Sequence, residues 1–168
     1  MLQNVLFGLI GIAILTAFCI TGAFLAPPAA YWFMTPTAVR VMEDAGISRR
    51  FSRKQKIALA ALIVLCCVLF LGLIIYAGTQ GVSAGMGMIG LSIRFLIMFW
   101  MTSVFDAVVL DWWMFTRTGL FGIWLKKQTG KAPAVWRVDP QWDGKEIHKL
   151  VLEMIASAAL AWLFLKLC

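Results

Sequence analysis

The sequence predicts an all-α integral membrane protein, a bundle of four transmembrane helices. Hydrophobic residues make up 62% of its 168 positions and charged residues 14%, whereas a soluble domain is typically about 45–50% apolar. Four continuous apolar runs also have the roughly 18–25 residues that a helix needs to cross about 30 Å of hydrocarbon. The strands of an outer-membrane barrel would instead alternate in segments of about ten residues. These observations favour helices over a barrel.

We expect one transmembrane domain whose helices cover residues 2–25, 57–77, 89–115 and 147–167. The first run has no Lys or Arg before it and is longer than the core of a signal peptide, so we expect it to be retained as a helix. Pro27 and Pro28 follow it and end the helix, because proline lacks a backbone N–H. The uncharged, Gly-rich segment 78–90 predicts a tight connection between the second and third helices. Residues 37–45 are expected to form a short helix that ends at Gly46.

The fifteen Lys and Arg residues predict the orientation. Six lie within residues 26–56 and seven within residues 117–149. By the positive-inside rule, both large loops, about 26–56 and 116–146, are expected in the cytoplasm and both termini outside. Arg94 and Lys166 are the two exceptions, and we expect their long side chains to snorkel to the opposite interface.

The net charge of +7 is thus concentrated on one side of the bilayer. Anionic headgroups attract basic segments by about 1 kcal/mol per residue near the surface, so the charge predicts lipid contact and argues against a nucleic-acid partner. In the second loop, large apolar residues precede Lys126 and Lys127, as in a segment at the headgroup boundary. That loop is either a lid anchored by tryptophans or part of a substrate site.

Polar residues in the apolar runs are the candidates for function. Asp106 lies near the middle of the third run, where a charge costs roughly 2.5–3.5 kcal/mol on insertion scales and therefore usually has a partner or a task. At a rise of 1.5 Å per residue, Asp106 is roughly 15 Å from the cytoplasmic end of its helix and Asp111 roughly 7 Å. Glu153 is roughly 9 Å inside the fourth helix. His148 stands at its entry, and Asp143 precedes it.

These five residues form a predicted polar site or proton relay in the cytoplasmic half. Asp106 and Asp111 are five positions apart, about 140° around a helix, so we do not expect a carboxylate dyad. Thr102 shares a face with Asp106 and can donate to it, and Lys149 can pair with Glu153. Asp106 can equally be a structural contact between helices, since buried polar residues serve both purposes in membranes. The pattern does not identify a cofactor or a metal ion.

The four cysteines show no Cys-x-x-Cys spacing, which disfavours a redox enzyme. Neighbouring side chains on a helix diverge, so Cys66 and Cys67 are not expected to form a disulfide.

The string Phe105-Asp106-Ala-Val-Val-Leu-Asp111-Trp112, followed later by Asp143-Gly-Lys-Glu-Ile-His148, covers about the C-terminal half. It resembles a group of small, uncharacterised prokaryotic multi-helix membrane proteins with an Asp-x4-Asp-Trp helix and a later Asp/His segment. The resemblance implies a prokaryotic inner-membrane location and candidate positions, but no activity. The membrane glutathione-transferase superfamily is similar in size and topology. The first large loop does not contain the Arg/Asn/Glu-rich signature of that superfamily, which argues against membership.

Three classes of function remain. A small proton- or ion-coupled transporter or channel would use Asp106 as its titrating group, and a chain of this size would be expected to form a homo-oligomer. A membrane enzyme acting on a lipid or lipid-linked substrate would use Asp111, Asp143 and His148 at the headgroup level as acid and base or as metal ligands. An accessory or assembly subunit would use Asp106 only as a contact with a membrane partner. We expect the first class.

Overall fold

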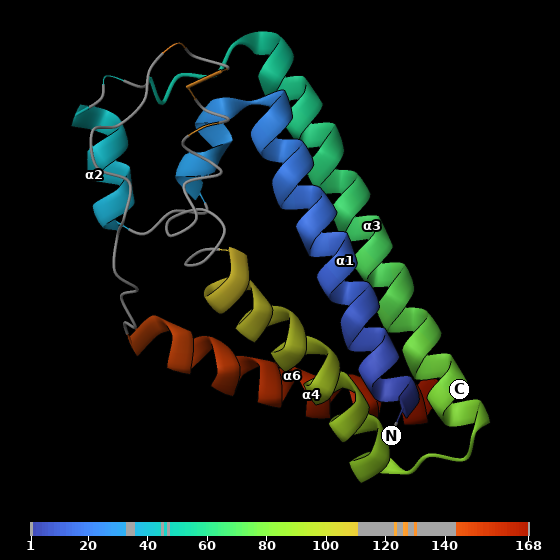
Figure 1. The fold of residues 1–168 in the computed structure, drawn as a ribbon. Coiled ribbons are helices and arrows are strands. Elements are labelled where there is room, and N and C mark those ends of the chain that lie inside the picture. Colours follow the sequence, from blue (N-terminus) through green and yellow to red (C-terminus); the bar gives the residue numbers. More distant parts are fainter. Residues whose placement is uncertain are drawn as a thin grey trace. The chain divides into compact units, whose positions relative to one another are not determined.

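The computed structural model is almost entirely helical in the residues that it describes, and none of those residues is in a strand (Figure 1). The described residues are 2–32, 36–44, 46, 48–110, 123, 126–127, 130 and 144–167. The helices are α1 (Leu2–Leu25), the 3-10 helix η1 (Pro27–Trp32), α2 (Pro36–Asp44), α3 (Arg53–Ser83), α4 (Met88–Phe105) and α6 (Gly144–Leu167). Residues 106–110 continue α4 as a wider π-helical turn.

Four of these helices are long and apolar enough to cross a membrane, as predicted: Leu2–Leu25, Arg53–Ser83, Met88–Leu110 and Ile147–Leu167. The first and last of these ranges match the predicted runs. The third begins one residue early, and the predicted residues 111–115 lie outside the described part. The short helix predicted at 37–45 is also present as α2, and Gly46 follows it with a positive φ of 68°.

Helix α3 is longer than predicted at both ends. At its start, the backbone N–H of Ser52 donates to Gln55 Oε1 at 2.9 Å and that of Gln55 donates to Ser52 Oγ at 3.3 Å, which is a reciprocal capping box. At its end, the amides of Gly85 and Met86 donate to the carbonyls of Val82 and Gly81. Gly85 has φ +72°, so this end is a Schellman motif. The predicted tight turn at 78–90 is therefore wrong in its first part, because residues 78–83 continue the helix.

By its internal contacts the chain divides into two units. The first comprises Met1–Leu15, Cys66–Val104 and Trp142–Cys168, and the second Thr16–Leu65 and Phe105–Gln141. Helices α1 and α3 contribute to both. All four apolar helices contribute to the first unit. That they form one four-helix bundle in a single domain stays a prediction.

The core of the first unit is apolar and draws on all four helices. Its buried residues are Phe7, Leu73, Ala77, Leu91, Phe95, Met98 and Ala161. Glycines allow the close approach: a Cβ atom added at Gly78 of α3 would lie 2.6 Å from the ring of Phe164 on α6. Small residues at such contacts are the usual means by which apolar helices pack closely in membranes.

The second unit has a smaller core where η1 returns against α3. Ala26, Ala29 and Leu59 are buried there, and Phe51 and Leu62 pack against them. At the surface of this unit, Nε of Arg49 lies 2.7 Å from Oε1 of Glu43, and its guanidinium carbon is 5.1 Å from the centroid of the Tyr31 ring.

Candidate functional site

Helices α4 and α6 hold the candidate site of the first unit. Trp100 of α4 donates its indole N–H to the Leu150 carbonyl at 3.2 Å. One helical turn further along, the Ser103 hydroxyl donates to Oε1 of Glu153. Ser103 is buried, Glu153 is half-buried, and the second carboxylate oxygen of Glu153 is shielded from solvent. The site therefore contains a carboxylate enclosed between two apolar helices and in contact with a hydroxyl.

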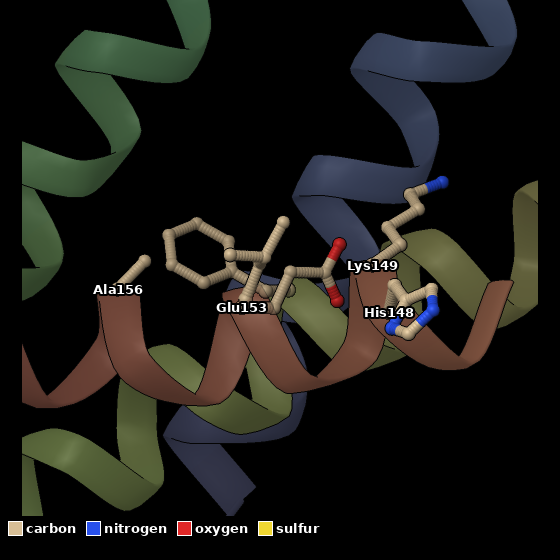
Figure 2. A pocket seen from close by; sticks show the side chains of 6 residues that line it. His148, Lys149, Glu153 and Ala156 are labelled. Carbon is tan, nitrogen blue, oxygen red and sulfur yellow. The ribbon is translucent and has the colours of Figure 1, made fainter. Parts of the chain in front are cut away.

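Glu153 also lines an open pocket of about 480 Å³. The wall of this pocket is formed by Phe99, His148, Lys149, Leu152, Glu153 and Ala156. Figure 2 shows the Glu153 side chain between Ala156 and Lys149 along α6, with the carboxylate directed to the end that carries Lys149 and His148. Apolar walls with a few convergent polar groups are typical of binding sites.

The structure thus brings together two of the five residues that the sequence predicts for the site. His148 and Glu153 line the same pocket, and Lys149, predicted as a partner for Glu153, lines it too. His148 is exposed and Lys149 is half-buried. The exposed imidazole and the partly enclosed carboxylate therefore line the same pocket.

Asp106 lies in the other unit, in the π-helical turn that follows α4, and is half-buried. Thr102 was expected to donate to it, but the Thr102 hydroxyl instead donates to the Met98 carbonyl at 2.8 Å. A hydroxyl has one proton to donate, and the backbone carbonyl four residues earlier is the nearest acceptor along a helix. The remaining predicted residues, Asp111 and Asp143, lie outside the described part of the chain.

Metal binding gains no support within the described ranges. No group of three or more His, Cys, Asp and Glu side chains that can hold a metal ion occurs among those residues. The proposed ligand set of the enzyme alternative included Asp111 and Asp143, which are outside these ranges. Cys66 and Cys67 are both free, as expected for neighbours on a helix.

The expectation that Arg94 snorkels to an interface is wrong. Its side chain is 1% exposed, and its Nε donates to Oδ1 of Asn4 at 3.0 Å. Its Nη1 donates to the Ala77 carbonyl at 3.0 Å and to Oε1 of Gln80. The guanidinium carbon is 5.3 Å from the centroid of the Phe7 ring, within the range of a cation–π contact. The Arg94 side chain points into the unit because α1 and α3 supply hydrogen-bond acceptors within its reach.

The Arg94 network continues to the surface, where Gln80 Nε2 donates to Gln3 Oε1 at 3.2 Å. Sequence reasoning missed this cluster. The available signal was that Arg94 stands six residues after the start of α4, about 9 Å along the helix and beyond its first turn. Asn4 and Gln80 are polar residues near the ends of two other apolar runs, which is where partners for such a cation are found.

Arg94 and Ser103 are nine residues apart on α4, about 14 Å along its axis. Between them the buried residues of α4 are Phe95 and Met98, which belong to the apolar core. The Arg94 cluster and the Glu153 pocket are therefore two separate polar features of the first unit.

Comparisons of the chain with protein-family models, with curated proteins and with solved structures returned no match. The resemblance of the Asp106–Trp112 and Asp143–His148 strings to small prokaryotic membrane proteins therefore stays a prediction.

Proposed function

We propose that this chain is a membrane protein that transports protons or small cations, with Glu153 as the carboxylate that takes up and releases them. The observation that carries the proposal is the hydrogen bond from Ser103 on α4 to the enclosed Glu153 on α6. An ionisable group in an apolar helix is rare and commonly lies on an ion or proton pathway.

The Ser103 hydroxyl suits either state of this carboxylate. It can donate to the ionised form and can accept from the protonated form, because a hydroxyl both donates and accepts. The pocket that contains His148 and Lys149 gives the group an approach from one side. The predicted role of Asp106 as a titrating carboxylate, and those of Asp111 and Asp143 as members of a polar site or relay, stay proposals beside that of Glu153.

The proposed setting is a prokaryotic inner membrane, with both large loops cytoplasmic and both termini outside. The start of α1 and the end of α6 belong to the same unit, and the proposal places both outside. Association of several copies would supply the pathway that one short chain has little room for. Extensive exposed apolar surface on the helices, such as Val64 at 62% and Ile89 at 76%, is available for lipid or for another copy.

The test is flux in proteoliposomes that contain a trapped pH-sensitive dye, with an imposed proton gradient and Na⁺ or K⁺ on either side. The proposal predicts that the wild-type chain dissipates the gradient and that Glu153→Gln, which keeps shape but cannot ionise, does not. The control is Lys126→Gln, a charge change at an exposed position of the other unit, which should transport normally. Absence of proton, Na⁺ and K⁺ flux from the wild type would contradict the proposal.

One observation favours the enzyme as a second candidate. His148 and Glu153 line a pocket with an otherwise apolar wall, and an imidazole and a carboxylate can act as general base and acid on a lipid that enters it. This candidate predicts a change in lipid composition when purified protein is incubated with vesicles of bacterial lipid extract. The transporter predicts flux with the lipids unchanged.

A further inference from the structure

The start of α3 carries a concentration of positive charge. The four cations are Arg50, Arg53, Lys54 and Lys56, and all are exposed. Segment 48–65 contains no acidic residue. Within the part of the chain that the structure describes, none of the four lies within 4.0 Å of a carboxylate, in contrast to Arg49, which pairs with Glu43. Within those residues, no carboxylate neutralises the charge of these four side chains.

The helix itself does not favour these cations. The N-terminal end of a helix carries a partial positive charge, which destabilises basic side chains in the first turn. The Ser52–Gln55 capping box already satisfies amides at this end. Arg53, Lys54 and Lys56 thus repel the helix end and one another, and an anion would relieve this repulsion.

An apolar groove begins beside these charges. It has a volume of about 300 Å³ and is lined by Phe51, Lys56, Leu59, Ala60 and Ile63. Lys56 is the charged residue of this lining, and Ile63 lies seven residues further along α3, about 10 Å away. The residues at the base of the groove pack against the core of the second unit: Leu59 is buried, and Phe51 packs on the same core as Ala26 and Ala29. One end of the groove is cationic and the other is apolar.

We propose that this groove binds one anionic phospholipid. Its phosphate lies against Lys56 and the neighbouring cations, and the first part of one acyl chain lies over Leu59, Ala60 and Ile63. A zwitterionic lipid fits less well, because its headgroup ammonium is repelled by the same cations. The cations attract any anion, but the groove continues from Lys56 along the apolar surface of the helix. A lipid can fill that apolar part with its acyl chain, whereas a free anion cannot, so the groove favours a lipid.

The experiment is native mass spectrometry of the full chain, released from detergent that contains phosphatidylglycerol or phosphatidylcholine with identical acyl chains. We expect one phosphatidylglycerol to be retained with at least a fivefold preference over phosphatidylcholine. Lys56→Gln should abolish the preference, and Ala60→Phe, which fills the groove, should lower retention of both lipids. The matched control Lys166→Gln removes the same charge at an exposed position of the other unit and should behave as wild type. Circular dichroism checks that all variants are helical.

Equal retention of the two lipids by the wild type would overturn the proposal and leave the cations with a role in topology alone. An equal loss in Lys166→Gln and Lys56→Gln would also overturn it, since net charge and not the groove would then be responsible. Binding of inorganic phosphate that depends on Lys56 and competes fully with phosphatidylglycerol, but is unaffected by Ala60→Phe, would identify an anion site in place of a lipid site.

Discussion

Nε of Arg94 lies 3.0 Å from Oδ1 of Asn4, a residue ninety positions earlier in the chain, and joins α4 to the first turn of α1. Both side chains are buried. An unpartnered cation is expensive in such surroundings, so the amide oxygen of Asn4 and the acceptors on α3 together hold the charge inside the unit.

Replacing Asn4 by Leu should therefore destabilise the chain. The change leaves Arg94 Nε without its acceptor, at a cost of about 1–3 kcal/mol. The measurement is the free energy of unfolding in mixed micelles. Gln3→Leu is the control, because Gln3 is exposed and contacts the network only through Gln80. If Asn4→Leu costs no more than Gln3→Leu, the network does not stabilise the fold.

Gly78→Ala should also destabilise the chain, by about 1–3 kcal/mol, because the new methyl group would overlap the Phe164 ring. Gly72 provides a matched control on the same helix, since nothing lies within 4 Å of a Cβ added there. Gly72→Ala should be neutral or slightly stabilising, because alanine is the better helix former. Thermal denaturation of the two variants compares them directly, and equal melting temperatures would contradict the packing of α3 on α6.

Tyr31 should ionise at higher pH than an ordinary tyrosine. Burial raises the pKa of its phenol, the Glu43 carboxylate raises it further, and the Arg49 guanidinium lowers it. A raised pKa in the fold means that neutral Tyr31 contributes stability below the pKa of the unfolded chain, about 10, and that this contribution is lost as pH rises through the folded value.

The measurement is phenolate absorbance in a Tyr76→Phe background, which leaves Tyr31 as the one tyrosine, since the chain contains two. Glu43→Gln should lower the pKa of Tyr31 and Arg49→Gln should raise it. Shifts in the opposite directions would refute the arrangement of these three side chains.

Ser103→Ala should reduce flux by about tenfold. The hydroxyl donates to a carboxylate, and hydrogen bonds to charged groups contribute about 1.5–3 kcal/mol. Ser92→Ala is the control on the same helix, because the Ser92 hydroxyl donates only locally, to the Met88 carbonyl at 2.9 Å. Equal flux in the two serine variants would remove Ser103 from the site.

Asp106→Asn should abolish proton coupling, because Asp106 is predicted as a titrating carboxylate near the middle of the third apolar run. The assay is again flux, with the oligomeric state measured beside it. A variant that assembles and transports like wild type would show that Asp106 has no central role.

The apolar helices could be predicted from sequence because length and composition decide whether a helix can span hydrocarbon. Leu2–Leu25 and Ile147–Leu167 follow from this rule alone. The extension of α3 could not be found in this way, because it depends on the Ser52–Gln55 cap and on the turn at Gly85, which are polar and local.

The same distinction applies to the candidate site residues: some can be recognised from composition alone, and others depend on which helices pack together. Glu153 and His148 were identified because ionisable residues are conspicuous in apolar runs. The contact of Glu153 with Ser103 was not identified, because a serine in a helix gives no signal until the partner helix is placed against it. Arg94 was misread for the same reason: its inward turn depends on Asn4 and Gln80, which are distant in sequence and meet only in the fold.

The most direct test of the role of Glu153 in transport is to observe the proton on its carboxylate. The chain has three glutamates, so carboxyl-¹³C glutamate gives three signals in a nanodisc-embedded sample, and Glu153→Gln identifies one of them by its loss. We predict that this signal titrates reversibly with pH and that Ser103→Ala changes its titration while Ser92→Ala does not. A Glu153 signal that stays constant across the pH range in which flux occurs would show that Glu153 does not carry the proton.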